Sequence, residues 1–138
     1  MIVAAAWLHA VGEGTGLRST GFAPVDGAVY LLSEGWPDPV VSLVAHQAQS
    51  RMLAPVFRAC EQLALFERIQ GWPSDITDFA VVMALGDGPN PDPDQCLRES
   101  TLRIPAKLGI SARDRGERER RLRRAIDRVQ SSLIAAPA

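Results

Sequence analysis

Apolar side chains recur along this chain at intervals of three and four residues, which is the spacing that places them on one face of an α-helix. In the middle of the chain these positions are Val56, Ala59, Cys60, Leu63 and Phe66. Near the C-terminus they are Leu122, Ile126, Val129 and Leu133. No stretch alternates apolar and polar residues as a half-buried strand does. The pattern therefore predicts an all-α protein.

Prolines, glycines and capping residues divide the first half of the chain into helices. Residues 2–11 are an apolar run that a glycine-rich stretch ends. Asp26 is a typical N-cap, so we expect it to begin a helix over residues 28–34, which Gly35 ends. Asp38 opens the next helix, because the proline that follows it is favoured at the first helical position.

The middle of the chain predicts two more helices and a loop. One helix covers residues 55–69 and carries the first apolar stripe. Residues 76–85 are almost all apolar, so this helix, capped by Ser74 or Asp75, is expected at the centre of the core. Residues 86–91 are rich in glycine and proline, and this composition predicts a loop.

The C-terminal residues 110–138 predict an amphipathic helix that is rich in arginine. A shorter helix precedes it, beginning at Asp92 and ending or kinking at Pro105. Ser111 and Asp114 have the spacing of a capping box, with aspartate in place of the usual glutamate. The second apolar stripe then follows one face of a helix that is otherwise charged.

The length of 138 residues fits a single domain, residues 1–138, and the 46% of apolar residues suffices for a core. The formal net charge of -1 excludes a generally basic surface. Cys60 and Cys96 show neither a disulfide framework nor a zinc spacing, which favours a reducing, cytoplasmic setting. The apolar residues 1–8 are too short to span a bilayer, so we expect no membrane association.

Three short fragments carry a family resemblance, in this order along the chain: Ala5-Ala6-Trp7-Leu8-His9-Ala10-Val11-Gly12, Thr20-Gly21-Phe22-Ala23-Pro24-Val25-Asp26-Gly27-Ala28 and Leu43-Val44-Ala45-His46-Gln47. They resemble a small bacterial branch of the HD-domain metal-dependent phosphohydrolases. That branch reads Leu-His-Asp-Ile-Gly, Thr-Gly-Phe-His-Pro-Leu-Asp-Gly and Val-Ala-His-His. A weaker match, residues 83–89, is similar to Ala-Asp-Met-Thr-Thr-Gly-Pro. The resemblance implies an HD-like helix bundle with a family-like core over residues 1–109.

The resemblance also implies a site for a divalent transition metal, held by histidines and carboxylates from several helices. His9 and His46 match two of the family's histidines. The other matching positions hold no such ligand here: they are Ala10, Ala23, Gln47 and Ala84. Two imidazoles alone do not complete a coordination shell. We therefore expect a dismantled, non-catalytic site without a cofactor, in which these six positions converge around a small cavity.

Simpler interpretations accompany each candidate residue. A histidine bonded to a backbone carbonyl explains His9 and His46 without a metal. Ser19 and Thr20 lie where they could contact phosphate, although formation of a turn explains them equally well. A binding or structural role is therefore the favoured function. The first alternative is a weak metal-dependent phosphohydrolase that acts on a phosphate ester through the two histidines.

The second alternative is association with nucleic acid through the helix over Arg113–Arg128. Acidic residues interleave with its arginines, several at the spacing of ion pairs, and no aromatic residue is present to stack on bases. This pattern favours a solvated, salt-bridged face over a nucleic-acid site. The first helix begins without a cap, as though the family's leading helix were missing. We expect the apolar face around Trp7 to drive self-association.

Overall fold

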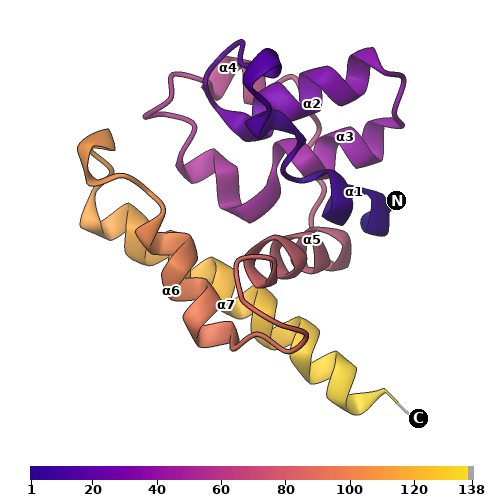
Figure 1. The fold of residues 1–138 in the computed structure, drawn as a ribbon, viewed down its shortest axis with the longest axis vertical. Helices are drawn as coiled ribbons and strands as arrows, with labels where there is room; N and C mark the ends of the chain where they lie inside the picture. The colour runs from indigo at the N-terminus through magenta and orange to yellow at the C-terminus, as the bar shows by residue number, and fades with distance from the viewer. Residues whose placement is uncertain (137–138) are drawn as a thin grey trace.

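Helix α5, Trp72–Met83, lies between two groups of helices in the computed structural model, which describes residues 1–136 (Figure 1). One group contains α1 (Ile2–Leu8), α2 (Ala23–Ser33), α3 (Asp38–Ala45) and α4 (Cys60–Leu63). The other contains α6 (Pro93–Leu102) and α7 (Ala112–Ala135). Short 3-10 turns connect them: η1 (Val11–Glu13), η2 (Thr15–Leu17), η3 (Gln47–Met52) and η4 (Ala106–Leu108). Within the described residues every regular element is helical, which confirms the prediction of an all-α single domain.

The first apolar core lies among α1, α2 and α3, with support from the segment around α4. Val25, Ala28 and Leu31 of α2 face this core and are at most 1% exposed. Helix α3 is buried along almost its whole length, from Val40 to Ala45, as its run of apolar residues requires. Its predicted beginning at Asp38 is confirmed, and Gly35 follows α2 with a positive φ of 78°.

Two predictions about the first half of the chain are wrong. Helix α2 begins at Ala23 rather than near residue 28, so Asp26 lies inside its first turn and does not cap it. Of residues 55–69, only the four residues of α4 are α-helical, and Arg58 adopts a left-handed φ of 53°. Tertiary contacts override the helical spacing there. Phe57, for example, stacks on Phe22 with ring centroids 4.8 Å apart.

Helix α5 begins at Trp72, which is two residues before Ser74 and three before Asp75, the predicted caps. Gly71 is its N-cap, with a φ of 78° that favours glycine, and Pro73 in the first turn supplies a φ suited to the helix. The central position of α5 is as predicted, because it contacts α1, α6, α7 and η3. Among its buried residues, however, two are polar: Thr77 and Asp78.

The second apolar core joins α5, α6 and α7. Its buried residues are Val82, Cys96, Leu97, Leu122 and Ile126. Gly86 lets the predicted loop approach α6, because a Cβ atom there would lie 2.6 Å from the Cys96 sulfur. The predicted start of α6 is confirmed by Asp92, whose carboxylate accepts hydrogen bonds from the amides of Asp94 and Gln95.

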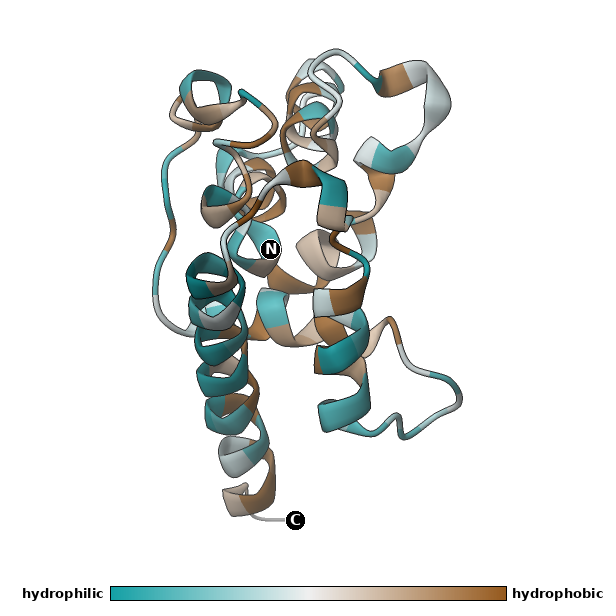
Figure 2. Cartoon of the chain, turned by 90° about the vertical axis from the view of Figure 1, so that its left-hand side faces the viewer, coloured by the Kyte–Doolittle hydropathy of each residue, from teal (hydrophilic) through white to brown (hydrophobic). Residues whose placement is uncertain are grey.

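Helix α7 crosses the second core and extends beyond it at its C-terminal end (Figure 1). Its first turn is capped by Ser111, whose hydroxyl accepts from the Asp114 amide and donates to the Asp114 carboxylate. Figure 2 shows the hydrophilic residues along most of its length and apolar ones near its end. The prediction that Leu133 extends the buried stripe is wrong, because its side chain is 65% exposed beyond the core. No helix within residues 1–136 combines the length and apolar character needed to cross a bilayer.

The depth of the α7 stripe gives a stability test. Leu122 and Ile126 are fully buried, so replacing either with alanine should lower the free energy of unfolding by about 2–5 kcal/mol. Leu133→Ala is the matched control, and we expect it to change that free energy by less than about 0.5 kcal/mol. Urea unfolding measures all three. Equal losses for Leu122→Ala and Leu133→Ala would contradict the orientation of α7.

Candidate functional site

The two candidate metal-binding histidines each use one ring nitrogen on the backbone. The His9 Nδ1 atom donates to the carbonyl oxygen of Ala6 at 2.7 Å, within α1. The His46 Nε2 atom donates to the carbonyl oxygen of Phe66 at 2.9 Å, in the segment that follows α4. Both side chains are half-buried. Such a hydrogen bond orients the imidazole and is common to histidines that stabilise a fold and to those that bind a metal.

The three family-like fragments meet, but mainly through their backbones. Gln47 is buried, and its side-chain amide donates to the His9 carbonyl oxygen at 2.6 Å. Gly12 packs so closely on α2 that a Cβ atom would lie 1.9 Å from the Ala23 carbonyl oxygen. Ala10 and Ala84 are both exposed. Among residues 1–136, no three metal-binding side chains gather in a group.

The cavity expected at these positions is found only in part. A cleft of about 400 Å³ borders Ala23 and Gly12, together with Glu13, Arg18 and Gly21. Ala10, Gln47 and Ala84 do not line it. The first and second fragments therefore share one cleft. The third fragment and Ala84 do not border that cleft.

Asp26, in the second fragment, binds the turn that precedes α2 through its buried carboxylate. It is 2% exposed, and its carboxylate accepts hydrogen bonds from the Ser19 hydroxyl, from the Thr20 amide and hydroxyl, and from the Gly21 amide, at 2.7–3.1 Å. Burial raises the pKa of Asp26, but these hydrogen bonds outweigh it and hold the pKa below its usual value. Ser19 and Thr20 thus form the turn that leads into α2, and Asp26 fixes that turn from inside the helix.

A second buried carboxylate, Asp78, lies where the two apolar cores meet. It accepts hydrogen bonds from the Ala48 amide at 2.6 Å and from the Gln49 side-chain amide at 2.8 Å. Ala48 and Gln49 have positive φ values of 48° and 58°. Such left-handed geometry costs roughly 1–2 kcal/mol for a residue other than glycine. Asp78 offsets part of this cost by bonding both residues.

Arg118 reaches the same junction from α7. Its Nε atom donates to the Ala48 carbonyl oxygen and its Nη2 atom to the Ser100 hydroxyl, both at 3.1 Å. Burial lowers the pKa of Arg118 to about 10 and raises the pKa of Asp78 to about 6. We call Asp78, Arg118, Ala48, Gln49 and Ser100 the polar junction. It ties η3, α5, α6 and α7 together.

An open cleft lined by arginines lies directly beside the polar junction. Its volume is about 300 Å³, and Gln49 belongs to both features. Four guanidinium groups border it: Arg68, Arg121, Arg124 and Arg128. The rest of the lining comes from Gln70 and from Gly71, Ser74 and Asp75 at the beginning of α5. We refer to this feature as the arginine cleft.

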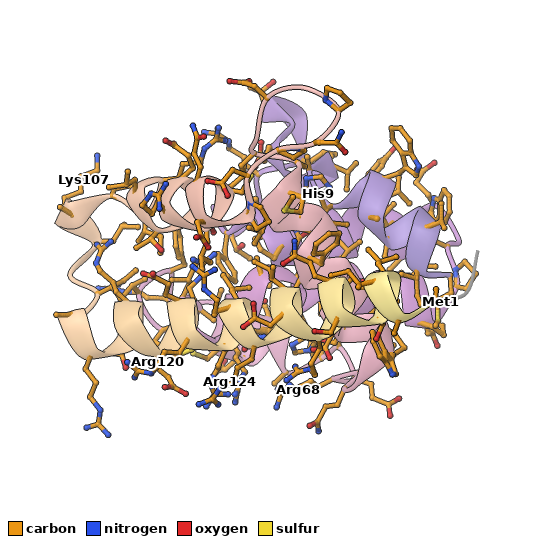
Figure 3. All side chains as sticks on the ribbon, turned by 90° about the horizontal axis from the view of Figure 1, so that it is seen from below. Met1, His9, Arg68, Lys107, Arg120 and Arg124 are labelled. Atoms are coloured by element: carbon orange, nitrogen blue, oxygen red, sulfur yellow. The ribbon has the colours of Figure 1, made fainter. Side chains whose placement is uncertain are left out.

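The charges of the arginine cleft are only partly balanced. Arg128 donates two hydrogen bonds of 2.7 Å to Asp75, and these raise the pKa of Arg128. Arg121 donates to Glu117 at 2.7 Å. Within the described part of the chain, no carboxylate lies within salt-bridge distance of Arg68 or Arg124. Figure 3 shows these two side chains close together on one side of the molecule, with His9 on the other.

Sequence reasoning missed most of this site. It included Arg118 in a solvated face, although Arg118 precedes Leu122 by four residues and so lies on the buried stripe. Asp78 falls inside an apolar run, where a lone acid is a signal for a buried polar contact. Nothing in the local pattern relates Arg68 to Arg124, because a tertiary contact brings them together. No protein-family model, curated protein or solved structure matches this chain.

The raised pKa of Asp78 makes stability depend on pH. An acid whose pKa is higher in the folded than in the unfolded state binds protons on folding, so its favourable contribution is present below about pH 4 and is lost as the pH rises to about 6. Asp78→Asn removes this dependence. Between pH 4 and 6.5, the wild-type protein should lose about 1–3 kcal/mol of unfolding free energy relative to Asp78→Asn. Urea unfolding of both proteins across this range measures the difference. If the difference in unfolding free energy between the two proteins stayed constant, or shifted in favour of the wild-type protein as the pH rises, the raised pKa of Asp78 would be contradicted.

Proposed function

We propose that this chain is a non-catalytic binding domain that captures an anionic ligand in the arginine cleft. The observation that carries the proposal is that Arg68 and Arg124 line one cleft and that, within residues 1–136, neither has a carboxylate within salt-bridge distance. Like charges that line one cleft repel each other, and a bound anion relieves that repulsion. Guanidinium groups also bind oxyanions with two parallel hydrogen bonds, which gives the cleft geometric preference as well as charge.

A non-catalytic role is supported by the state of the family-like positions. We propose an HD-like ancestry for the fold, with a metal site that has lost its ligands at Ala10, Ala23, Gln47 and Ala84. The alternative of a weak phosphohydrolase needs further ligands beside His9 and His46, while no three metal-binding side chains gather in a group within residues 1–136. Elemental analysis after gel filtration distinguishes the two: about one metal ion per chain would favour the hydrolase.

A cytoplasmic location is also part of the proposal.

Sulfate, a simple oxyanion, is a direct probe of the cleft. Titrated into the protein in low-salt buffer, it should shift the NMR signals of the Arg68 and Arg124 side chains and of the Ser74 amide. Arg68→Gln and Arg124→Gln should each weaken binding roughly tenfold, the effect of losing about one charge-assisted hydrogen bond. Calorimetry measures the affinities.

Arg113→Gln is the matched control for these variants. Arg113 lies on the same exposed side of α7, outside the arginine cleft, and the substitution removes the same charge. We expect it to leave sulfate binding unchanged. Full affinity in both cleft variants, or no sulfate binding at all, would overturn the proposed function.

Self-association through α1 is a further part of the proposal. Val3 and Trp7 lie four residues apart on one face of α1 and are 70% and 83% exposed. Apolar residues exposed together in this way are typical of a surface that another protein covers. Light scattering at high concentration tests the idea. An assembly that Trp7→Ser dissociates would support it, and a monodisperse wild-type monomer would contradict it.

A further inference from the structure

We propose that the ligand of the arginine cleft is a small phosphate monoester, bound through its terminal dianionic phosphate. This inference rests on the proposed function and narrows it from any anion to one chemical class. Three features of the cleft carry it: the number of unpaired charges, the hydrogen-bond donors around them, and the size and polarity of the space.

The charge of the cleft matches a dianion. Asp75 is already neutralised by the two hydrogen bonds from Arg128, and Arg121 shares the carboxylate of Glu117 with Arg120. Arg68 and Arg124 remain as two positive charges without a carboxylate partner in the described residues. A phosphate monoester carries close to two negative charges near pH 7 and has three terminal oxygens that accept hydrogen bonds. A phosphate diester carries one charge and leaves one guanidinium unbalanced.

Hydrogen-bond donors approach the cleft from three separate parts of the fold. Arg68 comes from the segment before α5, and Arg124 comes from α7. Ser74 lies in the first turn of α5, where backbone amides lack partners within the helix and point toward its N-terminal end. Donors from several directions suit a tetrahedral group with three terminal oxygens, whereas a planar carboxylate uses donors in one plane.

The space beside these donors is small and polar. A volume of about 300 Å³ lies at the lower limit of small-molecule pockets. Gln49 and Gln70 line it with amide groups, which both donate and accept hydrogen bonds. The part of the ligand beyond the phosphate is therefore expected to carry hydroxyl or similar groups rather than a large apolar body.

The surface around the cleft disfavours an extended polyanion such as nucleic acid. Along α7 the exposed arginines alternate with Glu117 and Asp127, and Glu117 holds both Arg120 and Arg121. A phosphate backbone following this helix would meet these carboxylates and would have to break those ion pairs. The arginine cleft instead combines Arg68 and Arg124, which have no carboxylate within salt-bridge distance in the described residues, with the start of α5.

The experiment compares four probes by calorimetry on the full chain: methyl phosphate, dimethyl phosphate, sulfate and acetate. At pH 7.5, methyl phosphate should bind at least roughly tenfold more tightly than dimethyl phosphate, since it offers one more charge and one more terminal oxygen. At pH 5, methyl phosphate should bind roughly tenfold more weakly than at pH 7.5, because only about a tenth of it remains a dianion.

Sulfate separates titration of the ligand from titration of the protein, because it stays a dianion over this pH range. The charged groups that face the cleft are its four arginines and Asp75, with Asp78 behind Gln49 and Glu117 beside Arg121. Any change in their protonation alters sulfate and methyl phosphate binding together. The inference therefore requires that the affinity for methyl phosphate, divided by the affinity for sulfate, falls when the pH is lowered from 7.5 to 5.

The outcomes separate failure of this inference from failure of the proposed function. If dimethyl phosphate or acetate binds as tightly as methyl phosphate, the cleft binds anions without selecting a monoester, and only this inference is overturned. If no probe binds, the proposed function is overturned as well. If a short single-stranded DNA binds more tightly than methyl phosphate and Arg113→Gln weakens it as much as Arg124→Gln, the ligand is a polyanion and the inference is wrong.

Discussion

The structure depends on a buried polar contact, the hydrogen bonds of Asp78 and Arg118 to the backbone at Ala48. This residue donates its amide to Asp78 and accepts at its carbonyl from Arg118. Its backbone is left-handed, and the hydrogen bonds with Asp78 and Arg118 hold it in that strained conformation. One apolar core ends at this turn and the other begins beside it. A carboxylate and a guanidinium, both taken out of water, are retained where they determine how the two halves of the fold meet.

The arginine cleft is a consequence of this junction. Gln49 bonds Asp78 with its side chain and lines the cleft, and Asp75 lies one helical turn before Asp78 on α5. Arg118 positions α7, and Arg124 and Arg128 of the same helix line the cleft at the beginning of α5. The ion pair between Arg128 and Asp75 closes one wall and leaves the other arginines available. Repulsion among these arginines is thus offset by packing energy from the buried face of α7.

How far the sequence predicted this structure depends on the range of the interactions. Local signals were reliable: Asp92 begins α6, Ser111 begins α7, and Leu122 with Ile126 marks the buried face of α7. Where non-local contacts decide the structure, the local signals gave wrong predictions. Asp26 resembles a cap by itself, yet it bonds a turn five to seven residues earlier in the chain. The spacing after Pro55 is helical, yet stacking on Phe22 and burial in the core select turns. The arginine cleft joins residues 56 positions apart, Arg68 and Arg124, which no local pattern relates.

The most direct test of this account is to locate a bound tetrahedral dianion. Crystals soaked in sodium tungstate, a heavy analogue of sulfate and phosphate, reveal the ion by the anomalous scattering of tungsten. The account predicts that the strongest anomalous peak lies in the arginine cleft, between the guanidinium groups of Arg68 and Arg124 and near the Ser74 amide. A cleft without tungsten at saturating tungstate, with the ion bound instead beside Arg113 and Arg120, would contradict it.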